Sequence, residues 1–386
     1  ILTCDWSSDV CSSDLLLGAC GGQSNIAPPA PLVSFKPSAS VKKLWSVDVG
    51  KGEKKRFVEL APAMQGDTLY AADIEGRVSA FAVKKGRARW SVDLKEPVGA
   101  AVGFGEDLVL IGTKNGHVYA LASENGELRW KGSVSTEILS RPAAQSGVVV
   151  VQTIDGKVFG LSANDGSRVW VQQRIEPALS LRGTSSPLIS EGVVFAGFAN
   201  GKVVALNLQS GRPVWERSVA QPRGRNEIDR LIDVDATPLV AGGALFAVSY
   251  QGKLVAIDRG SGREIWTREE SSYSGMVADA RNVYLTDAQG HVSAFDQRSG
   301  SNLWTQDQLR GRGLNRPSLI VDYLAVGDFE GYVHWLSRDS GELVARTRIG
   351  SSPINGSGIA SGNTLFLQNQ AGALAALEIS SELSAR

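Results

Sequence analysis

Cysteine, net charge and long apolar runs are the features that this chain of 386 residues lacks most clearly. All three cysteines, Cys4, Cys11 and Cys20, lie at the amino end, so the rest of the chain forms neither disulfides nor thiolate metal sites. Lys plus Arg and Asp plus Glu number 40 each, which gives no charge to attract nucleic acid. No stretch of 18 apolar residues occurs, so no transmembrane helix is expected.

Histidine is equally scarce, and sequence motifs for catalysis are missing. The three histidines are His117, His291 and His334, and two of them occupy the same position of different repeats, so we interpret them as strand residues. There is no Gly-x-Ser-x-Gly elbow and no phosphate-binding loop. We therefore expect no catalytic residue, no metal site and no cofactor.

The amino-terminal segment has an unusual composition. Residues 1–14 contain no Lys or Arg, so they are no ordinary secretory signal start, and residues 1–15 resemble translated adapter text that we interpret as non-native. The following Leu17-Gly18-Ala19-Cys20 resembles the end of a bacterial lipoprotein signal, although so short a match can arise by chance. We predict a residual signal over 1–19, an acylated Cys20, and a flexible proline-containing tether over 20–40.

A unit of two glycines and a tryptophan repeats about every 40 residues along the chain. Gly76, Gly86 and Trp90 form one copy, and five further copies with the same spacing end at Trp130, Trp170, Trp215, Trp266 and Trp304. A seventh copy has Ala345 where Trp is expected, and an eighth begins at Gly372 and then decays. A period of this length suits four short strands per repeat.

The positions within the repeat predict an all-β fold. Asn, Asp and Gly at the glycine positions favour hairpin turns, while the Trp supplies a large apolar surface that can wedge between sheets. Trp45 has no repeat before it, and the eighth copy lacks its own Trp, so the strand around Trp45 should complete the blade of residues 355–380. We predict an eight-bladed β-propeller over 41–380, closed by the N-terminal strand, with a tail over 381–386. Seven blades are the alternative.

Two adjacent segments between repeats are long. From the Trp to the next first glycine there are 31 residues after Trp170 and 37 after Trp215, against 24 to 26 after Trp90, Trp130 and Trp266. The segment from Trp45 to Gly76 also spans 31 residues, but it is rich in Lys and Arg, and we interpret it as a solvated basic loop. In a propeller such segments cross from an outer strand to the next inner strand over one face. Because loops beyond the structural minimum often carry binding, these two crossings predict a partner-binding surface.

The pattern Gly-x-Val-x-Ala-Leu followed by Gly-x-x-x-Trp resembles the tryptophan-docking repeat of quinoprotein (PQQ-like) propellers. Within that superfamily, residues 41–379 are similar to the propeller lipoproteins of the bacterial outer-membrane β-barrel assembly machinery. The resemblance implies a non-enzymatic scaffold, anchored at the periplasmic face of the outer membrane, that assists the insertion of β-barrel proteins. It also implies binding to the POTRA domains of the central subunit (BamA), and contact with the other lipoproteins and with nascent outer-membrane proteins.

Two stretches within the long crossings match loops that bind the central subunit in that family. By resemblance the contact residues are Leu179, Leu181, Arg182, Asp233 and Asp235. An alternative interpretation is that the two aspartates cap a turn and that the leucines belong to the core. At the level of the whole protein, the alternatives are a PQQ-dependent dehydrogenase-like propeller and a periplasmic propeller that holds a small ligand in its channel. The Cys-Cys pair of the dehydrogenases is missing here.

Overall fold

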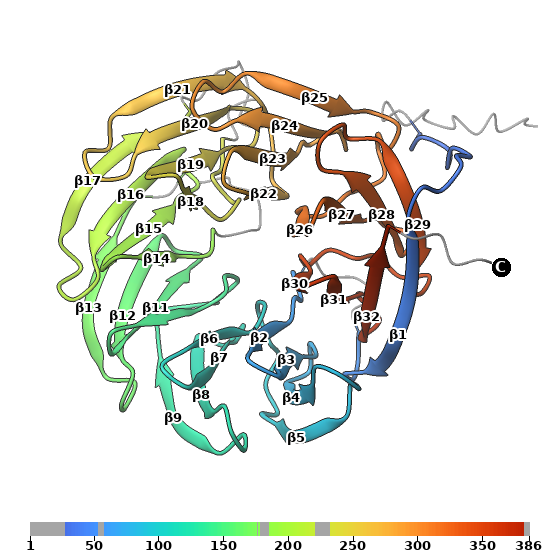
Figure 1. The fold of residues 1–386 in the computed structure, drawn as a ribbon. Coiled ribbons are helices and arrows are strands. Elements are labelled where there is room, and N and C mark those ends of the chain that lie inside the picture. The colour runs from blue at the N-terminus through green and yellow to red at the C-terminus, as the bar shows by residue number, and fades with distance from the viewer. Residues whose placement is uncertain (1–27, 53–57, 176, 178–184, 221–231, 382–386) are drawn as a thin grey trace, which may run out of the picture.

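The computed structural model describes residues 28–52, 58–175, 177, 185–220 and 232–381, and in these ranges the regular elements are 32 strands. They form eight antiparallel four-stranded sheets that stand around a ring as blades (Figure 1). The predicted eight-bladed propeller is therefore confirmed. No helix in the described ranges is long and apolar enough to cross a membrane.

Each blade is a meander that runs from the centre of the ring to its rim. In the first four blades the strands are β2 Ala63–Gln65, β3 Thr68–Ala72, β4 Arg77–Ala82 and β5 Ala88–Asp93; β6 Gly103–Gly105, β7 Leu108–Gly112, β8 His117–Ala122 and β9 Leu128–Ser133; β10 Ala143–Gln145, β11 Val148–Thr153, β12 Lys157–Ser162 and β13 Arg168–Gln173; β14 Leu188–Ser190, β15 Val193–Gly197, β16 Lys202–Asn207 and β17 Pro213–Ser218. The third strand of each of these blades has six residues.

The other four blades repeat this plan, and the last one takes its outer strand from the other end of the chain. Their strands are β18 Leu239–Ala241, β19 Ala244–Val248, β20 Lys253–Asp258 and β21 Glu264–Glu269; β22 Gly275–Ala278, β23 Asn282–Thr286, β24 Val292–Asp296 and β25 Asn302–Gln306; β26 Ser318–Ile320, β27 Tyr323–Gly327, β28 Tyr332–Ser337 and β29 Leu343–Arg348; β30 Ile359–Ser361, β31 Thr364–Gln368, β32 Ala373–Ser380 and β1 Ser40–Asp48.

The ring closes through β1 and β32. These strands pair antiparallel from Ser40 opposite Ser380 to Asp48 opposite Ala373, so the N-terminal strand is the outer strand of the eighth blade. Figure 1 shows the blue β1 lying beside the red β32. The predicted closure is confirmed, and the seven-bladed alternative is wrong. Closure leaves no blade without a neighbour, which removes the exposed sheet faces that an open array would have.

The tryptophans of the repeat lie between blades. The Trp130 indole N–H donates to the Ala163 carbonyl of the next blade at 2.7 Å. A Cβ on Gly166, which has φ +71°, would lie 2.5 Å from Cε3 of that ring, so only glycine lets the turn approach the indole. The same N–H···O bond, at 2.7 to 3.1 Å, joins seven consecutive blade pairs through Trp45, Trp90, Trp130, Trp170, Trp215, Trp266 and Trp304.

The hydrophobic core lies between neighbouring blades. The second strand of each blade is almost entirely buried, as the Val148–Thr153 strand shows, whereas the outer strand β5 has exposed and half-buried side chains. One core cluster joins Leu110 of the second blade to Val149 and Leu161 of the third. Blades of this kind stabilise one another, because each buries its apolar faces only when both neighbours are present.

The ring has two distinct faces. The segments that link one blade to the next all follow outer strands, which run in the same direction, so they emerge on one side that we call the crossing face. The turns between the second and third strands of each blade lie there too: the Leu94 amide donates to the carbonyl of Gly76, in the turn between β3 and β4. The turns at Gly86 and Gly166 lie on the opposite face.

Candidate partner-binding face and the polar network of the seventh blade

The two long crossings emerge from neighbouring blades, as predicted. Residues 174–187 link β13 to β14, and residues 219–238 link β17 to β18. The described ends of both crossings lie on the crossing face, between the third and fourth and between the fourth and fifth blades. Leu179, Leu181 and Arg182 lie outside the described residues.

The structure places Asp233 and Asp235 on either side of a buried valine. Val234 fills the space beside Gly197, where an added Cβ would lie 2.6 Å from Cγ1 of Val234. Asp233 is fully buried, and its backbone carbonyl accepts a hydrogen bond from Tyr250 at 2.9 Å. Asp235 is half-buried. Of the two predicted acidic contacts, Asp235 is therefore the one that reaches the surface.

Three exposed apolar side chains lie on the crossing face. Ile175, at the start of the first long crossing, is 90% exposed, and its carbonyl accepts from the Asn200 side chain at 3.0 Å. Ile154, in the third blade, and Tyr273, in the crossing from the fifth to the sixth blade, are exposed on the same face. The sequence does not reveal these residues, because a single apolar residue in a loop carries no periodic signal. Aromatic and aliphatic side chains held at a surface are common at the centres of interfaces.

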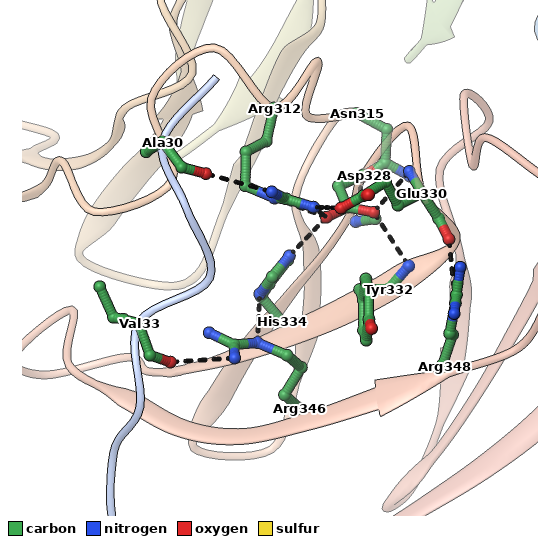
Figure 2. A network of polar contacts seen from close by, with 11 residues as sticks. Ala30, Val33, Arg312, Asn315, Asp328, Glu330, Tyr332, His334, Arg346 and Arg348 are labelled. Atoms are coloured by element: carbon green, nitrogen blue, oxygen red, sulfur yellow. Dashed lines mark hydrogen bonds and ion pairs between the residues drawn. The ribbon is translucent and has the colours of Figure 1, made fainter. Parts of the chain in front are cut away.

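A buried polar network occupies the seventh blade (Figure 2). Asp328, in the turn between β27 and β28, accepts from Arg312 Nε at 2.8 Å and from His334 Nε2 at 2.9 Å. Arg346, on β29, donates from Nε to His334 Nδ1 at 3.2 Å. Because Nδ1 accepts, the imidazole is neutral and carries its proton on Nε2. Arg312, Asp328 and His334 are all buried.

Burial and neighbouring charges set the protonation of this network. Burial lowers the pKa of His334, and the positive charges of Arg346 and Arg312 add to that effect, while Asp328 opposes it. Burial alone would raise the pKa of Asp328, but its bonds to His334, Tyr332 N–H and Arg312 lower the pKa overall. The network therefore keeps an ionised carboxylate and a neutral histidine at neutral pH.

The segment before β1 lies across this network. Arg312 Nη1 donates to the Ala30 carbonyl at 3.1 Å, and Arg346 Nη1 donates to the Val33 carbonyl at 3.0 Å. The Arg346 guanidinium also lies 5.1 Å from the centre of the Phe35 ring. The structure thus differs from the flexible tether predicted over 20–40, because residues 28–39 are attached to the propeller. Cys20 lies outside the described residues.

The described residues contain no group of three or more His, Cys, Asp or Glu placed to hold a metal ion. His117 contacts Glu96 Oε2 at 2.7 Å, and His291 contacts Asp287 Oδ2 at 2.7 Å, so each histidine has a single carboxylate partner nearby. The third histidine belongs to the buried network. What the geometry defines is an eight-bladed propeller of tryptophan-docked repeats with one loop-rich face.

Comparison with known proteins assigns the family. The family model described as outer membrane protein assembly factor BamB matches residues 74–306 and 288–382. The BamB of Pseudomonas aeruginosa is 43% identical over 94% of this chain and 96% of the relative, and that of Kangiella koreensis is 40% identical over 94% and 93%. The chain belongs to the BamB family of outer membrane protein assembly factors.

Solved structures agree with this assignment. BamB from Moraxella catarrhalis superposes with a TM-score of 0.80 at 30% identity, over 88% of this chain and 100% of that one. The quinohemoprotein alcohol dehydrogenase of Comamonas testosteroni gives a TM-score of 0.71 at 12% identity, over 90% of this chain and 77% of that one, which shows the fold alone. The relatives carry the name of an assembly factor and not of an enzyme.

Proposed function

We propose that this chain is a lipid-anchored scaffold at the periplasmic face of the outer membrane, where it assists the insertion of β-barrel proteins. Its crossing face binds the POTRA domains of the central subunit BamA, and acylated Cys20 holds it at the membrane. The observation that carries the proposal is the pair of long crossings on neighbouring blades, beside the exposed Ile175. Membership of the BamB family supports the same role.

The binding chemistry combines an apolar centre with charges around it. Leu179 and Leu181 provide apolar surface, Arg182 provides a bidentate donor for a carboxylate, and Asp235 provides an acceptor. Asp233 acts inside the fold and holds the crossing in place, because its side chain is fully buried. The other lipoproteins of the complex and nascent barrel strands are further proposed contacts. A closed ring of blades offers few free strand edges for pairing with such strands.

Charge reversal on the two faces of one blade tests the binding surface. Arg182→Glu changes the first long crossing, and Arg212→Glu makes the same change on the exposed, opposite face of the fourth blade. We expect Arg182→Glu to reduce co-purification with BamA at least tenfold, and Arg212→Glu to leave it unchanged. Asp235→Lys should weaken recovery as well. Undiminished recovery with Arg182→Glu would remove that residue from the interface.

A second assay addresses the dehydrogenase-like alternative. The purified chain is mixed with PQQ and Ca²⁺, and its thermal stability and the fluorescence of the cofactor are followed. We expect no saturable change in either signal. Saturable stabilisation would favour the alternative and would contradict a purely scaffolding role.

A further inference from the structure

The N-terminal segment takes an unexpected route along the seventh blade. It runs antiparallel to β29: Ser38 donates to the Val344 carbonyl at 3.0 Å, Val33 lies at Arg346, and Ala30 donates to the Arg310 carbonyl at 2.8 Å. Arg310 belongs to the crossing between β25 and β26. The segment therefore emerges on the crossing face. Figure 2 shows the contacts of its Ala30 and Val33 carbonyls with Arg312 and Arg346.

The strand that follows begins on the other side of the ring. Outer strands run towards the crossing face, and β1 does the same, since Asp48 leads into the crossing that ends at β2. Its first residue, Ser40, consequently lies at the opposite face. A chain that was not held against β29 would leave the propeller there, so the contacts of residues 28–39 move the exit point across the thickness of the ring.

Two arginines hold residues 28–39 on this route by binding backbone carbonyls of the segment rather than its side chains. Arg312 and Arg346 each donate to a carbonyl of the segment, and both are held in place from behind, by Asp328 and by His334 respectively. The Phe35 ring covers the second guanidinium. Arginines fixed by a buried carboxylate and a neutral imidazole lose little side-chain entropy when they bind, which strengthens the attachment.

We propose that this network, which we call the leader clamp, directs the membrane anchor to the crossing face and so makes that face the one nearest the membrane. The inference rests on the proposed acylation of Cys20. With the clamp closed, about eight residues separate Cys20 from Pro28, a maximal span of roughly 28 Å. From Cys20 to Ser40 there are about 20 residues, or roughly 70 Å, at 3.3–3.6 Å per residue. The clamp therefore shortens the tether by more than half.

Hydrogen exchange on the full chain with Cys20→Ser tests the clamp without any lipid. In the wild-type background we expect slow exchange at the amides of Ala30 and Ser38. Arg346→Ala should speed exchange at Ala30 at least tenfold. Its control is Arg348→Ala, on the same strand, whose side chain donates to the Glu330 carbonyl at 3.2 Å and contacts no described residue of the segment.

A second variant distinguishes opening of the clamp from unfolding of the propeller. Phe35→Ala removes the ring over Arg346 and leaves the buried network intact, so it should raise exchange at Ala30 by a smaller factor. Unchanged exchange at Ala30 in both Arg346→Ala and Phe35→Ala would overturn the clamp. This result does not depend on acylation.

The membrane-facing side is tested with acylated protein on vesicles that carry a quenching lipid. A fluorophore is attached through Asn115→Cys, on the crossing face of the second blade, or through Glu124→Cys, on its opposite face; both positions are exposed. We expect stronger quenching at position 115, and loss of the difference in Arg346→Ala. Equal quenching with wild-type clamp residues would refute the orientation, whereas failure to bind vesicles at all would refute the proposed anchor.

Discussion

Trp335 on β28 pairs across the sheet with Ala345 on β29, which is the reverse of the size pattern in the other blades. In those seven blades a Trp on the outer strand pairs with Ala or Gly on the strand next to it, as Trp130 does with Ala120. Trp335 is fully buried and belongs to the core cluster shared with Leu365 and Leu377 of the eighth blade. The Trp335 side chain thus fills the space between the seventh and eighth blades, as the other tryptophans do between their blades. It projects from the third strand of its blade and not from the outer strand.

The way in which the ring closes explains this reversal. Each outer-strand Trp rests on a glycine turn that joins the third and fourth strands of the next blade. In the eighth blade those strands are β32 and β1, which come from opposite ends of the chain and share no turn. The backbone of Ser38 and Ala39 lies there instead and donates to the Val344 carbonyl. A Trp at position 345 would have neither the glycine nor the carbonyl that its indole needs.

The first prediction concerns this pair. Trp335→Ala should lower the free energy of unfolding by about 3–5 kcal/mol, as expected for loss of a buried tryptophan. The double change Trp335→Ala/Ala345→Trp restores the pattern of the other blades but should recover less than half of the loss, because no glycine turn receives the new ring. Urea unfolding measures both. Full recovery in the double variant would show that the two positions are interchangeable.

Much of the fold could be predicted from the spacing of Gly and Trp. Glycine turns and the tryptophans that pack on them recur at fixed spacing in the sequence. The number of blades and the closure of the ring could therefore be predicted by counting the repeats. Trp335 has no such signature, because the equivalent position of the other repeats is occupied by Ala or Gly. Its role depends on the meeting of β32 and β1, which are more than 300 residues apart.

The candidate site was only partly predictable for the same reason. The lengths of the crossings after Trp170 and Trp215 predicted long links between neighbouring blades, and the order of the strands places them there. The burial of Asp233 could not be foreseen, since it depends on Val234 fitting beside Gly197 of another strand. The leader clamp joins residues 30–35 to Arg312 and Arg346, and prolines near these residues suggested a free tether instead.

Glycine at the docking turns gives a second prediction. Gly166→Ala places a Cβ 2.5 Å from the Trp130 ring, whereas Gly147→Ala, in the same blade, meets no atom within 4 Å. Both glycines have positive φ, 71° and 79°, so both variants bear the same backbone strain of about 1 kcal/mol. Gly166→Ala should be less stable than Gly147→Ala by about 1–3 kcal/mol. Equal melting temperatures would mean that the turn moves away from the indole freely.

A third prediction concerns Glu96 on the crossing between β5 and β6. Burial would raise its pKa, but hydrogen bonds from Lys131, His117 and Tyr119 lower it to about 2. The folded pKa lies below the ordinary value of 4.5. The stabilisation is therefore complete above pH 4.5 and is lost as the pH falls towards 2.

Glu96→Gln should consequently reduce stability at pH 7 by about 2 kcal/mol, since charge-assisted bonds are replaced by neutral ones. It should also flatten the dependence of the melting temperature on pH between 4.5 and 2. The control is Glu124→Gln, an exposed carboxylate in the same blade. An unchanged acid profile in Glu96→Gln would assign the acid sensitivity to other carboxylates.

A fourth prediction links pH to the leader clamp through His334. Four groups face its ring: Asp328 from the turn before β28, Arg346 from β29, Arg312 from the crossing before β26, and Tyr332 at 6.2 Å between ring centres. The folded pKa of His334 lies below its ordinary value of 6.5. The neutral form therefore stabilises the fold above pH 6.5, and this contribution is lost as the pH falls below it.

Protonation of His334 would put a proton on Nδ1, the atom that accepts from Arg346 Nε. Arg346 must then turn away, and its bond to the Val33 carbonyl is lost with it. We expect hydrogen exchange at Ala30, corrected for the intrinsic effect of pH, to speed up at least threefold between pH 7.5 and 5.5. His334→Gln keeps a donor for Asp328 and an acceptor for Arg346 but does not titrate, so its corrected exchange should stay constant. A pH response of equal size in His334→Gln would show that another group controls the release of the segment.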